Sequence, residues 1–379
     1  RVEGASALAD AERVARWSED IDACVNGLLA RHKNPTQRVS SEALRAAGEQ
    51  LKGQIAAFDD ARLNLGIMAI CALVGDAHTT ASLGVKGQPY RSLPLDTAWL
   101  SEGVFVLGTR TEDARFLGGK IVAIGGVPIE EVTRRLGTVI SHENDGWVRQ
   151  QARSFVRLGD VLRALDLSPS GAEATFSIVR PGESRAEDLT LKVLQQGERP
   201  RLSSAVDAAA PGFALTLKPR VGGVWYGHRL LEDSRTLYVW YDRCQDQAGL
   251  SSVSAWTQEV FKVIDEQKPA RVVIDLRRNG GGNSALLGVM ELGIAQRQKA
   301  GAALPVKVLI GRGTFSSGMM NAIELKNLCG ATLIGSPTGG KPNAYGEIQS
   351  FTLPHSGITV TYCTKLFKRW PEDVDAVPA

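Results

Sequence analysis

The stretch ARVVIDLRRNGGGN, Ala270 to Asn283, joins a short apolar run to three consecutive glycines. The run is rich in β-branched residues and favours a buried strand, and the glycines favour a tight loop after it. Amphipathic patterns typical of helices lie on both sides, at 252–267 and 284–298. The same alternation of strand and helix patterns extends to TLYVWY (236–241), PVKVLIG (305–311), SSGMMNAIELKNL (316–328) and ATLIG (331–335). This order predicts an α/β fold with a mainly parallel sheet covered by helices.

The first part of the chain, residues 1–84, has a different pattern and is expected to be helical. In SEALRAAGEQLKGQIAAF the apolar residues Leu44, Leu51 and Ile55 recur at helical spacing, and a serine precedes the pattern as a candidate cap. The segment ends in the polar motif DAHT, which has no place in the helical pattern.

Residues 85–200 hold short apolar runs separated by Gly and Pro, which predicts a small β-rich module. An unusually long helical pattern near 141–167 interrupts its strands. The segment 194–212, rich in Gly, Pro, Ser and Ala, predicts a linker into a third region, 201–379, which contains the α/β core.

Composition excludes several classes of protein. The 379 residues include 44 basic and 41 acidic side chains, for a net charge of +3, and no stretch concentrates Lys and Arg with aromatic residues as nucleic-acid binders do. We therefore expect no nucleic-acid partner. No run approaches the roughly 20 apolar residues of a membrane span. The five scattered cysteines lack metal-ligand or disulfide spacing, so we expect neither a metal site nor disulfides.

Three loops follow strands of the predicted parallel sheet, where ligands and catalytic groups of such sheets gather. They are RRNGGGN, GRGTFSSG and SPTGGKPN. A serine at the start of a helix is most often a cap. A nucleophilic serine at this place would lie at the positive end of the helix, with the next backbone N–H available for an oxyanion. The glycines could bind phosphate, supply a second oxyanion donor, or only connect strand to helix.

The loop GSPTGGKP, Gly335 to Pro342, has the G-x-x-x-x-G-K pattern of a phosphate-binding P-loop. A nucleotide site also needs a hydroxyl after the lysine, to hold magnesium, and a helix that begins there. Pro342 supplies no hydroxyl, and the following residues have strand and turn patterns. The sequence therefore argues against a nucleotide site and leaves Lys341 available for other chemistry.

The order DLRRNGGG, GRGTFSSG, GSPTGGKP resembles the C-terminal processing, or tail-specific, serine peptidases, with their tricorn-core and retinoid-binding relatives. LVGDAHTTAS and GGKIVAIGGVPIEEV resemble the motif and the PDZ-domain core that precede the catalytic region there. The resemblance implies a PDZ-like module followed by a crotonase- or Clp-protease-like core. From the family's spacing between nucleophile and lysine, it implies Ser316 as the nucleophile. The oxyanion donors would be Ser317 with Gly281 or Gly282.

The resemblance leaves two candidates for the general base. Processing peptidases use the lysine, here Lys341, which would have to be neutral in a desolvated site. The tricorn branch uses the histidine of its D-G-H-T motif, here His78, whose ordinary pKa of about 6.5 already suits a base. We favour His78. Glu347 is expected to orient it, with Gln349 as the alternative partner.

The favoured function is therefore a serine peptidase that acts on peptides or protein tails without metal or organic cofactor. A non-catalytic binding protein of the same fold and a small-molecule esterase are the alternatives. The resemblance favours a periplasmic or secreted location and says nothing of oligomeric state. The remaining histidines (His32, His142, His228 and His355) are expected at the surface or in loops.

Overall fold

The computed structural model describes residues 2–205 and 223–379, with the side chains of residues 2–9 left aside. The chain divides into two compact units. Unit 1 comprises Arg1–Glu143, Val148–Phe213 and Tyr345–Leu366, and unit 2 comprises Asn144–Trp147, Ala214–Ala344 and Phe367–Ala379. The predicted linker, 194–212, lies partly outside the described residues.

Unit 1 begins with the expected helices, α1 (Val2–Arg31), α2 (Ser41–Lys52) and α3 (Asp60–Leu73). The hydroxyl of Ser40 accepts the N–H of Ala43, and this bond caps α2 as the sequence predicts. Helix α3 has apolar residues on every side because it is largely buried. No helix of the described residues is both long and apolar enough to cross a membrane.

The second region of unit 1 is the expected β-rich module, whose strands all pair antiparallel. The main strands have the order β1-β2-β3-β5-β6. Their bounds are β1 (Leu95–Leu100), β2 (Gly103–Thr109), β3 (Lys120–Ile124), β5 (Glu173–Val179) and β6 (Ala186–Lys192), and the short strands β4 (Val127–Pro128) and β7 (Ser203–Ser204) pair with β3 and β2. The helices are α4 (Ile129–Val139), α5 (Asp145–Phe155) and α6 (Gly159–Ala164), with the 3-10 turn η1 (Thr111–Phe116). The predicted helical insertion is thus formed by α5 and α6.

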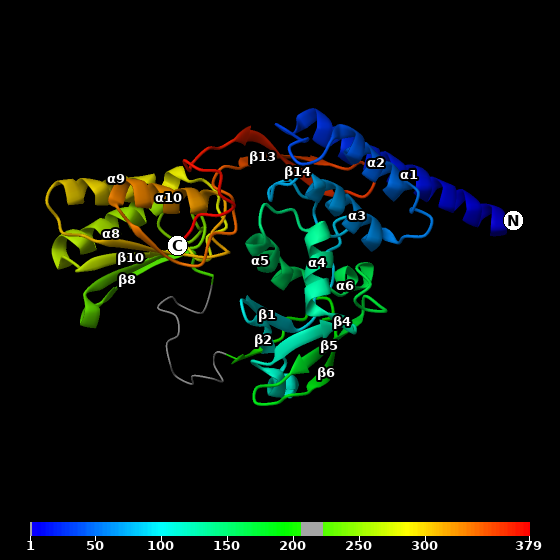
Figure 1. Cartoon of the computed structure of the whole chain (residues 1–379), viewed down its shortest axis with the longest axis horizontal. Coiled ribbons are helices and arrows are strands. Elements are labelled where there is room, and N and C mark those ends of the chain that lie inside the picture. The colour runs from blue at the N-terminus through cyan, green and yellow to red at the C-terminus, as the bar shows by residue number, and fades with distance from the viewer. Residues whose placement is uncertain (1, 206–222) are drawn as a thin grey trace. The chain divides into compact units, whose positions relative to one another are not determined.

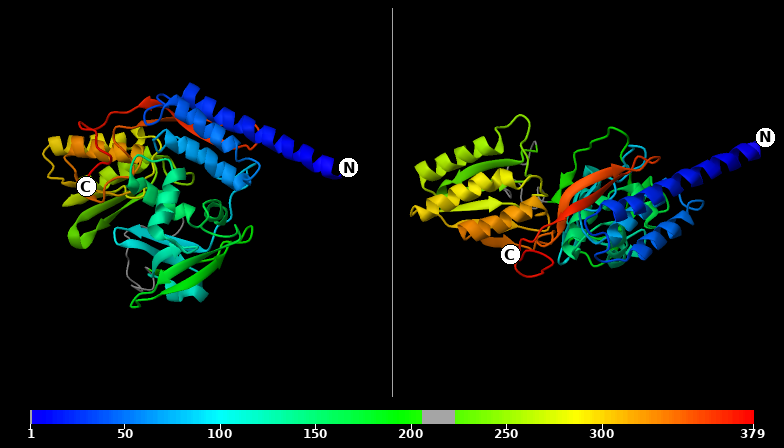
Figure 2. Two further views of the ribbon diagram at one scale, coloured as in Figure 1. Left: turned by 45° about the vertical axis from the view of Figure 1, so that its right-hand side comes forward. Right: turned by 90° about the horizontal axis from the view of Figure 1, so that it is seen from above.

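A hairpin from the last part of the chain completes unit 1. Strands β13 (Tyr345–Thr352) and β14 (Thr359–Leu366) pair with each other, and β14 lies against α1 (Figures 1 and 2). The N–H of Thr361 donates to the carbonyl of Thr80, directly after the DAHT motif. The sequence analysis assigned this hairpin to the third region, 201–379. The structure instead packs it with the N-terminal helices.

Unit 2 contains the α/β core that the strand and helix alternation predicts. Its sheet has the order β12-β11-β10-β9-β8, in which β9 to β12 are parallel and β8 is an antiparallel edge strand. The helices α8, α9 and α10 lie along this sheet (Figure 1). The strands are β8 (Tyr226–Leu231), β9 (Thr236–Tyr241), β10 (Arg271–Asp275), β11 (Val306–Ile310) and β12 (Thr332–Gly335), and the helices are α8 (Val253–Gln267), α9 (Ala285–Lys299) and α10 (Ser317–Cys329), with the turn η2 (Glu232–Ser234).

Parallel pairing explains why three distant loops meet in unit 2. The loops that follow β10, β11 and β12 all leave the same edge of the sheet, because the three strands point the same way. These loops contain the three glycines, the two serines and Lys341.

The packing of α9 on α8 yields a stability prediction. A Cβ at Gly293 would lie 2.0 Å from Cζ of the buried Phe261, whereas a Cβ at Gly288 of the same helix would meet nothing within 4 Å. We expect Gly293→Ala to destabilise unit 2 by ~1–3 kcal/mol through overpacking. Gly288→Ala should stabilise it by up to ~1 kcal/mol through helix propensity. Urea titrations of the two variants measure both effects, and a shift of the same sign in both would contradict the packing.

Candidate active site

Ser316 occupies a strained turn between β11 and α10. Its backbone has φ 50° and ψ −127°, a conformation usually reserved for glycine at tight turns. The residue stands at the N-cap position, but its side chain makes no capping hydrogen bond. The Ser316 side chain therefore does not cap helix α10. Its hydroxyl is not used in the way usual for a serine at the start of a helix.

The glycine loop lies directly against this hydroxyl. A Cβ at Gly281 would be 2.7 Å from the Cβ and 3.2 Å from the Oγ of Ser316, so any larger residue would displace the turn. Gly281 and Gly282 have φ values of 110° and 134°, which side chains rarely tolerate. Ser317 adds a link, because its Oγ donates a hydrogen bond to the carbonyl of Gly282 at 2.6 Å.

Two of the three predicted oxyanion donors have unused N–H groups. The N–H of Gly281 donates to Oδ1 of Asn279 at 2.9 Å, so this group is already engaged. Within the described part of the chain, the N–H groups of Gly282 and Ser317 donate to no protein acceptor. The geometry therefore favours Gly282 over Gly281 as the partner of Ser317.

Asn279 is a residue that the sequence analysis did not single out. It is fully buried, and its Nδ2 donates to the carbonyl of Tyr241 at 2.8 Å. Its backbone carbonyl accepts the N–H of Phe315 at 2.9 Å. Asn279 thus ties β9, the glycine loop and the serine turn together. An asparagine next to three glycines was the available signal, because an amide that both donates and accepts suits a buried loop.

The Lys341 loop touches the serine turn. The N–H of Gly339 donates to the carbonyl of Thr314 at 3.2 Å, and a Cβ at Gly340 would be 3.0 Å from the ring of Phe315. The side chain of Lys341 is largely buried, and its Nζ pairs with Asp373 Oδ1 at 2.9 Å. To act as a base, Lys341 would have to lose both its proton and this ion pair.

His78 lies in unit 1, in a turn organised by the buried carboxylate of Asp76. Asp76 Oδ1 accepts the N–H groups of His78 and Thr79 at 3.0 and 2.8 Å. Burial lowers the pKa of His78, although the charge of Asp76 and a hydrogen bond with the Tyr345 backbone partly oppose this. His78 is therefore neutral at neutral pH, as a general base must be.

The position of His32 contradicts the expectation that this residue lies at the surface or in a loop without a partner. It is 5% exposed, and its Nε2 lies 2.9 Å from Asp76 Oδ2, so it belongs to the DAHT turn. The N–H of Asn34 donates to Nδ1 of His32, which leaves Nε2–H as the donor to Asp76. Burial alone would raise the pKa of Asp76, but the His32 contact and other hydrogen bonds hold it below its usual value. The sequence could not show this pairing because 44 residues separate the partners.

The carboxylates beside His78 are Asp76 and Glu143, whose oxygen atoms lie within 4.8 Å of a ring nitrogen and of one another. Glu347, the predicted partner, has an exposed side chain and a φ of 58° on the hairpin, and Gln349 is exposed too. Glu143 was missed because it falls in the helical insertion, where the sequence shows no motif.

Donor atoms of types that bind metals gather around Asp76. His32 and Cys363 form one such group with it, and His78 and Glu143 form another. However, the two oxygens of Asp76 already accept four hydrogen bonds, including one from the Cys363 thiol at 3.2 Å. A carboxylate has about four lone-pair sites. Asp76 is thus the centre of a hydrogen-bond network, in which Oδ1 accepts three of these bonds and Oδ2 accepts the fourth, from His32.

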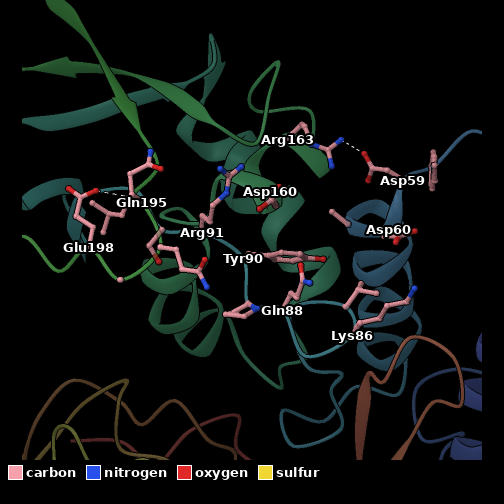
Figure 3. A pocket seen from close by; sticks show the side chains of 18 of the residues that line it. Asp59, Asp60, Lys86, Gln88, Tyr90, Arg91, Asp160, Arg163, Gln195 and Glu198 are labelled. Carbon is pink, nitrogen blue, oxygen red and sulfur yellow. Dashed lines mark hydrogen bonds and ion pairs between the residues drawn. The ribbon is translucent and has the colours of Figure 1, made fainter.

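A separate cavity of about 1190 Å³ opens in unit 1 (Figure 3). Several of its charged side chains are paired: Asp59 with Arg163 (Figure 3), and Asp60 with Arg13. Tyr90 projects toward its centre and donates to Oδ1 of Asn64 at 2.8 Å. None of the residues that line the cavity is a predicted site residue.

The structure therefore collects most of the predicted residues in unit 2. Ser316, Ser317, the glycines and Lys341 lie on adjoining loops there. His78 and Glu347 belong to unit 1.

The fold and the serine turn define an α/β protein with a mainly parallel sheet and a nucleophile-like serine at its carboxyl edge. No family model matches the chain, and no curated protein matches it. Several solved structures do match the chain. Mature CPAF complexed with lactacystin superposes with a TM-score of 0.64 at 13% identity, covering 96% of this chain and 93% of that chain. A mutant of CPAF has a TM-score of 0.64 at 12% identity, with coverages of 96% and 92%.

The photosystem II D1 C-terminal processing protease is also similar, with a TM-score of 0.43, 15% identity and coverages of 96% and 92%. The likeness to CPAF extends over nearly the whole of both chains and shows that this chain has the CPAF fold. This confirms the α/β fold class expected from the sequence.

The strain at Ser316 is measurable. Glycine tolerates φ 50° and alanine does not, so Ser316→Gly should be more stable than Ser316→Ala by ~1 kcal/mol. Thermal or urea unfolding of the two variants makes the comparison. Equal stabilities would contradict a strained turn.

Proposed function

We propose that this chain is a serine peptidase that cleaves peptide bonds through an acyl-enzyme on Ser316. The observation that carries the proposal is the Ser316 turn: its hydroxyl makes no capping bond, its backbone is strained, and it packs against a glycine loop in which the N–H of Gly282 donates to no acceptor among the described residues. Strain of this kind persists where the surrounding structure enforces it, and it is concentrated at functional sites. The resemblance of the three loop motifs to processing peptidases supports the same reading.

The reaction follows from the roles of these groups. Ser316 Oγ attacks the carbonyl carbon of the substrate while a base takes the hydroxyl proton. The carbonyl oxygen becomes an oxyanion and accepts hydrogen bonds from the N–H groups of Ser317 and Gly282. The base gives this proton to the leaving amine. Water then attacks the acyl-enzyme while the base takes its proton, and the base returns that proton to Ser316 Oγ as the ester bond breaks.

His78 is the base that we propose, with Lys341 in a structural role. The pKa of His78 is lowered by burial, so its imidazole is neutral under ordinary conditions. Lys341 is ion-paired with Asp373. The pair Gly339 and Gly340 packs on the serine turn, so Lys341 and its loop support that turn.

Covalent labelling tests the nucleophile without knowledge of the natural substrate. A fluorophosphonate probe should modify one residue of the full chain, Ser316, and mass spectrometry of the digested protein identifies it. The Ser316→Ala protein should not be labelled. Folded protein that resists labelling would refute the proposed function and leave the binding-protein alternative ahead.

A pair of neighbouring glycines provides the matched control for the oxyanion site. Gly281→Ala places a methyl group 2.7 Å from the Cβ of Ser316, displaces the serine turn from the proposed oxyanion donors, and should slow labelling by on the order of 10²-fold or more. At Gly280 an added Cβ would meet nothing within 4 Å. Gly280→Ala should therefore label at nearly the rate of the unmodified protein.

The choice of base has its own test. His78→Ala should slow labelling by on the order of 10²-fold or more, the usual contribution of a general base. Lys341→Met keeps the apolar stem without the charge and should slow labelling by less than about tenfold, because it removes only an ion pair. The opposite ranking would assign the base to Lys341.

A further inference from the structure

Glu143 is a buried carboxyl group that the proposed chemistry does not yet use. Its side chain belongs to a residue that is 7% exposed, and its Oε1 accepts the N–H of Ala77 at 2.9 Å. Its Oε2 is closed to solvent and has no hydrogen-bond partner among the described residues. Native proteins leave few buried polar atoms unsatisfied, and those few are concentrated at functional places.

The neighbours of Glu143 show which group its open oxygen could serve. Donor or acceptor atoms of Glu143, Asp76 and His78 all lie within 4.8 Å of one another. Both oxygens of Asp76 already accept hydrogen bonds. Its Oδ1 accepts the backbone N–H groups of His78 and Thr79 and the thiol of Cys363, and its Oδ2 accepts Nε2–H of His32. Glu143 is thus the carboxyl of this group with an oxygen, Oε2, that accepts no hydrogen bond from the described residues.

We propose that Glu143 is the positioning residue of His78, and that its ionised carboxylate accepts the imidazole N–H and leaves the other ring nitrogen as the proton acceptor. This inference rests on the proposed function, in which His78 is the base. Carboxylates that hold a histidine tautomer act in this way in many active sites. Glu143 takes the part that the sequence analysis assigned to Glu347.

The protonation of Glu143 then controls the site. Burial, helped by the charge of Asp76, raises the pKa of Glu143 to about 8, while the hydrogen bond from the Ala77 N–H and the charge of Arg38 oppose the shift. Arg38 also binds the backbone carbonyl of Glu143 at 3.4 Å. Below about pH 8 the carboxyl is protonated, and its O–H would donate to the imidazole nitrogen that it faces. The outer ring nitrogen would then carry the hydrogen and could not accept a proton.

The other titratable groups around the Glu143 carboxyl keep their protonation state over the pH range in which Glu143 titrates. Burial raises the pKa of Cys363 well above its usual value, so it remains a neutral thiol. Hydrogen bonds hold the pKa of Asp76 below its usual value, so it remains ionised. Burial lowers the pKa of His78, which is therefore neutral on both sides of the Glu143 transition. The reactive form is thus the one in which Glu143 has lost its proton.

The test measures the fluorophosphonate labelling rate of Ser316 in the full chain across the pH range. In the unmodified protein the rate should rise with pH to a plateau, with a midpoint near 8, the pKa of Glu143. Glu143→Gln has an amide oxygen that accepts the imidazole N–H at every pH. Its profile should shift to a midpoint below about 6.5, where His78 itself titrates. Glu143→Ala should retain the shifted midpoint but lose on the order of 10-fold or more of the plateau rate, because the ring is no longer held.

Glu130→Gln is the matched control, since it removes the same charge from an exposed carboxylate of the same unit. Its profile should coincide with that of the unmodified protein. A Glu143→Gln profile that coincides with the unmodified one would overturn the inference while leaving the labelled Ser316 in place. Failure of the unmodified protein to label would instead overturn the proposed function and this inference with it.

Stability provides a control for folding. Because burial raises the pKa of Glu143 from 4.5 to about 8, its contribution to stability is complete below pH 4.5 and is lost as the pH rises through 8. Glu143→Gln should remove this loss. Variants whose urea midpoints at pH 7 are no lower than that of the unmodified protein are folded, and their labelling rates can be compared directly.

Discussion

The hydrogen bonds of Asn279 are the constraint on which the candidate site of unit 2 depends. The buried side chain of Asn279 accepts the N–H of Gly281 and donates to the carbonyl of Tyr241 in β9. The backbone carbonyl of Asn279 accepts the N–H of Phe315. Gly318 packs so closely that a Cβ there would lie 2.6 Å from Asn279. The glycine loop and the serine turn therefore cannot move independently, and the relative placement of Gly281, Gly282 and Ser316 depends on this residue.

The same buried network holds the turn of Ser316 in a conformation that the residue alone would avoid. The positive φ of Ser316 is opposed by contact between its Cβ and its own backbone, which the surrounding hydrogen bonds overcome. The result is a hydroxyl that points away from the cap of α10 and lies beside Gly281. Strain of this kind is common at functional sites, where the geometry of a side chain is maintained at a cost in local stability.

In unit 1 the buried carboxylate of Asp76 joins distant segments by hydrogen bonds, as Asn279 does in unit 2. Asp76 gathers His32 from the end of α1, Cys363 from β14 and the backbone of its own motif around two oxygen atoms. This network links the hairpin β13–β14 to the N-terminal helices and fixes the backbone of the turn that contains the partly buried His78.

The sequence by itself determined the secondary structure and the parallel sheet, because hydrophobic periodicity and glycine placement are local signals. It also predicted that the three loops of unit 2 meet, since parallel strands bring their carboxyl ends to one edge, whereas Ser316 was singled out by the resemblance of the loop motifs to processing peptidases. Only the tertiary structure decided the partners of His32, the place of the hairpin and the burial of Glu143. Those contacts join residues 44, 281 and 66 positions apart, such as His32 with Asp76, Thr80 with Thr361, and Ala77 with Glu143. A hydrogen bond between distant residues leaves no periodic trace in the sequence, because its geometry exists only once both segments have packed.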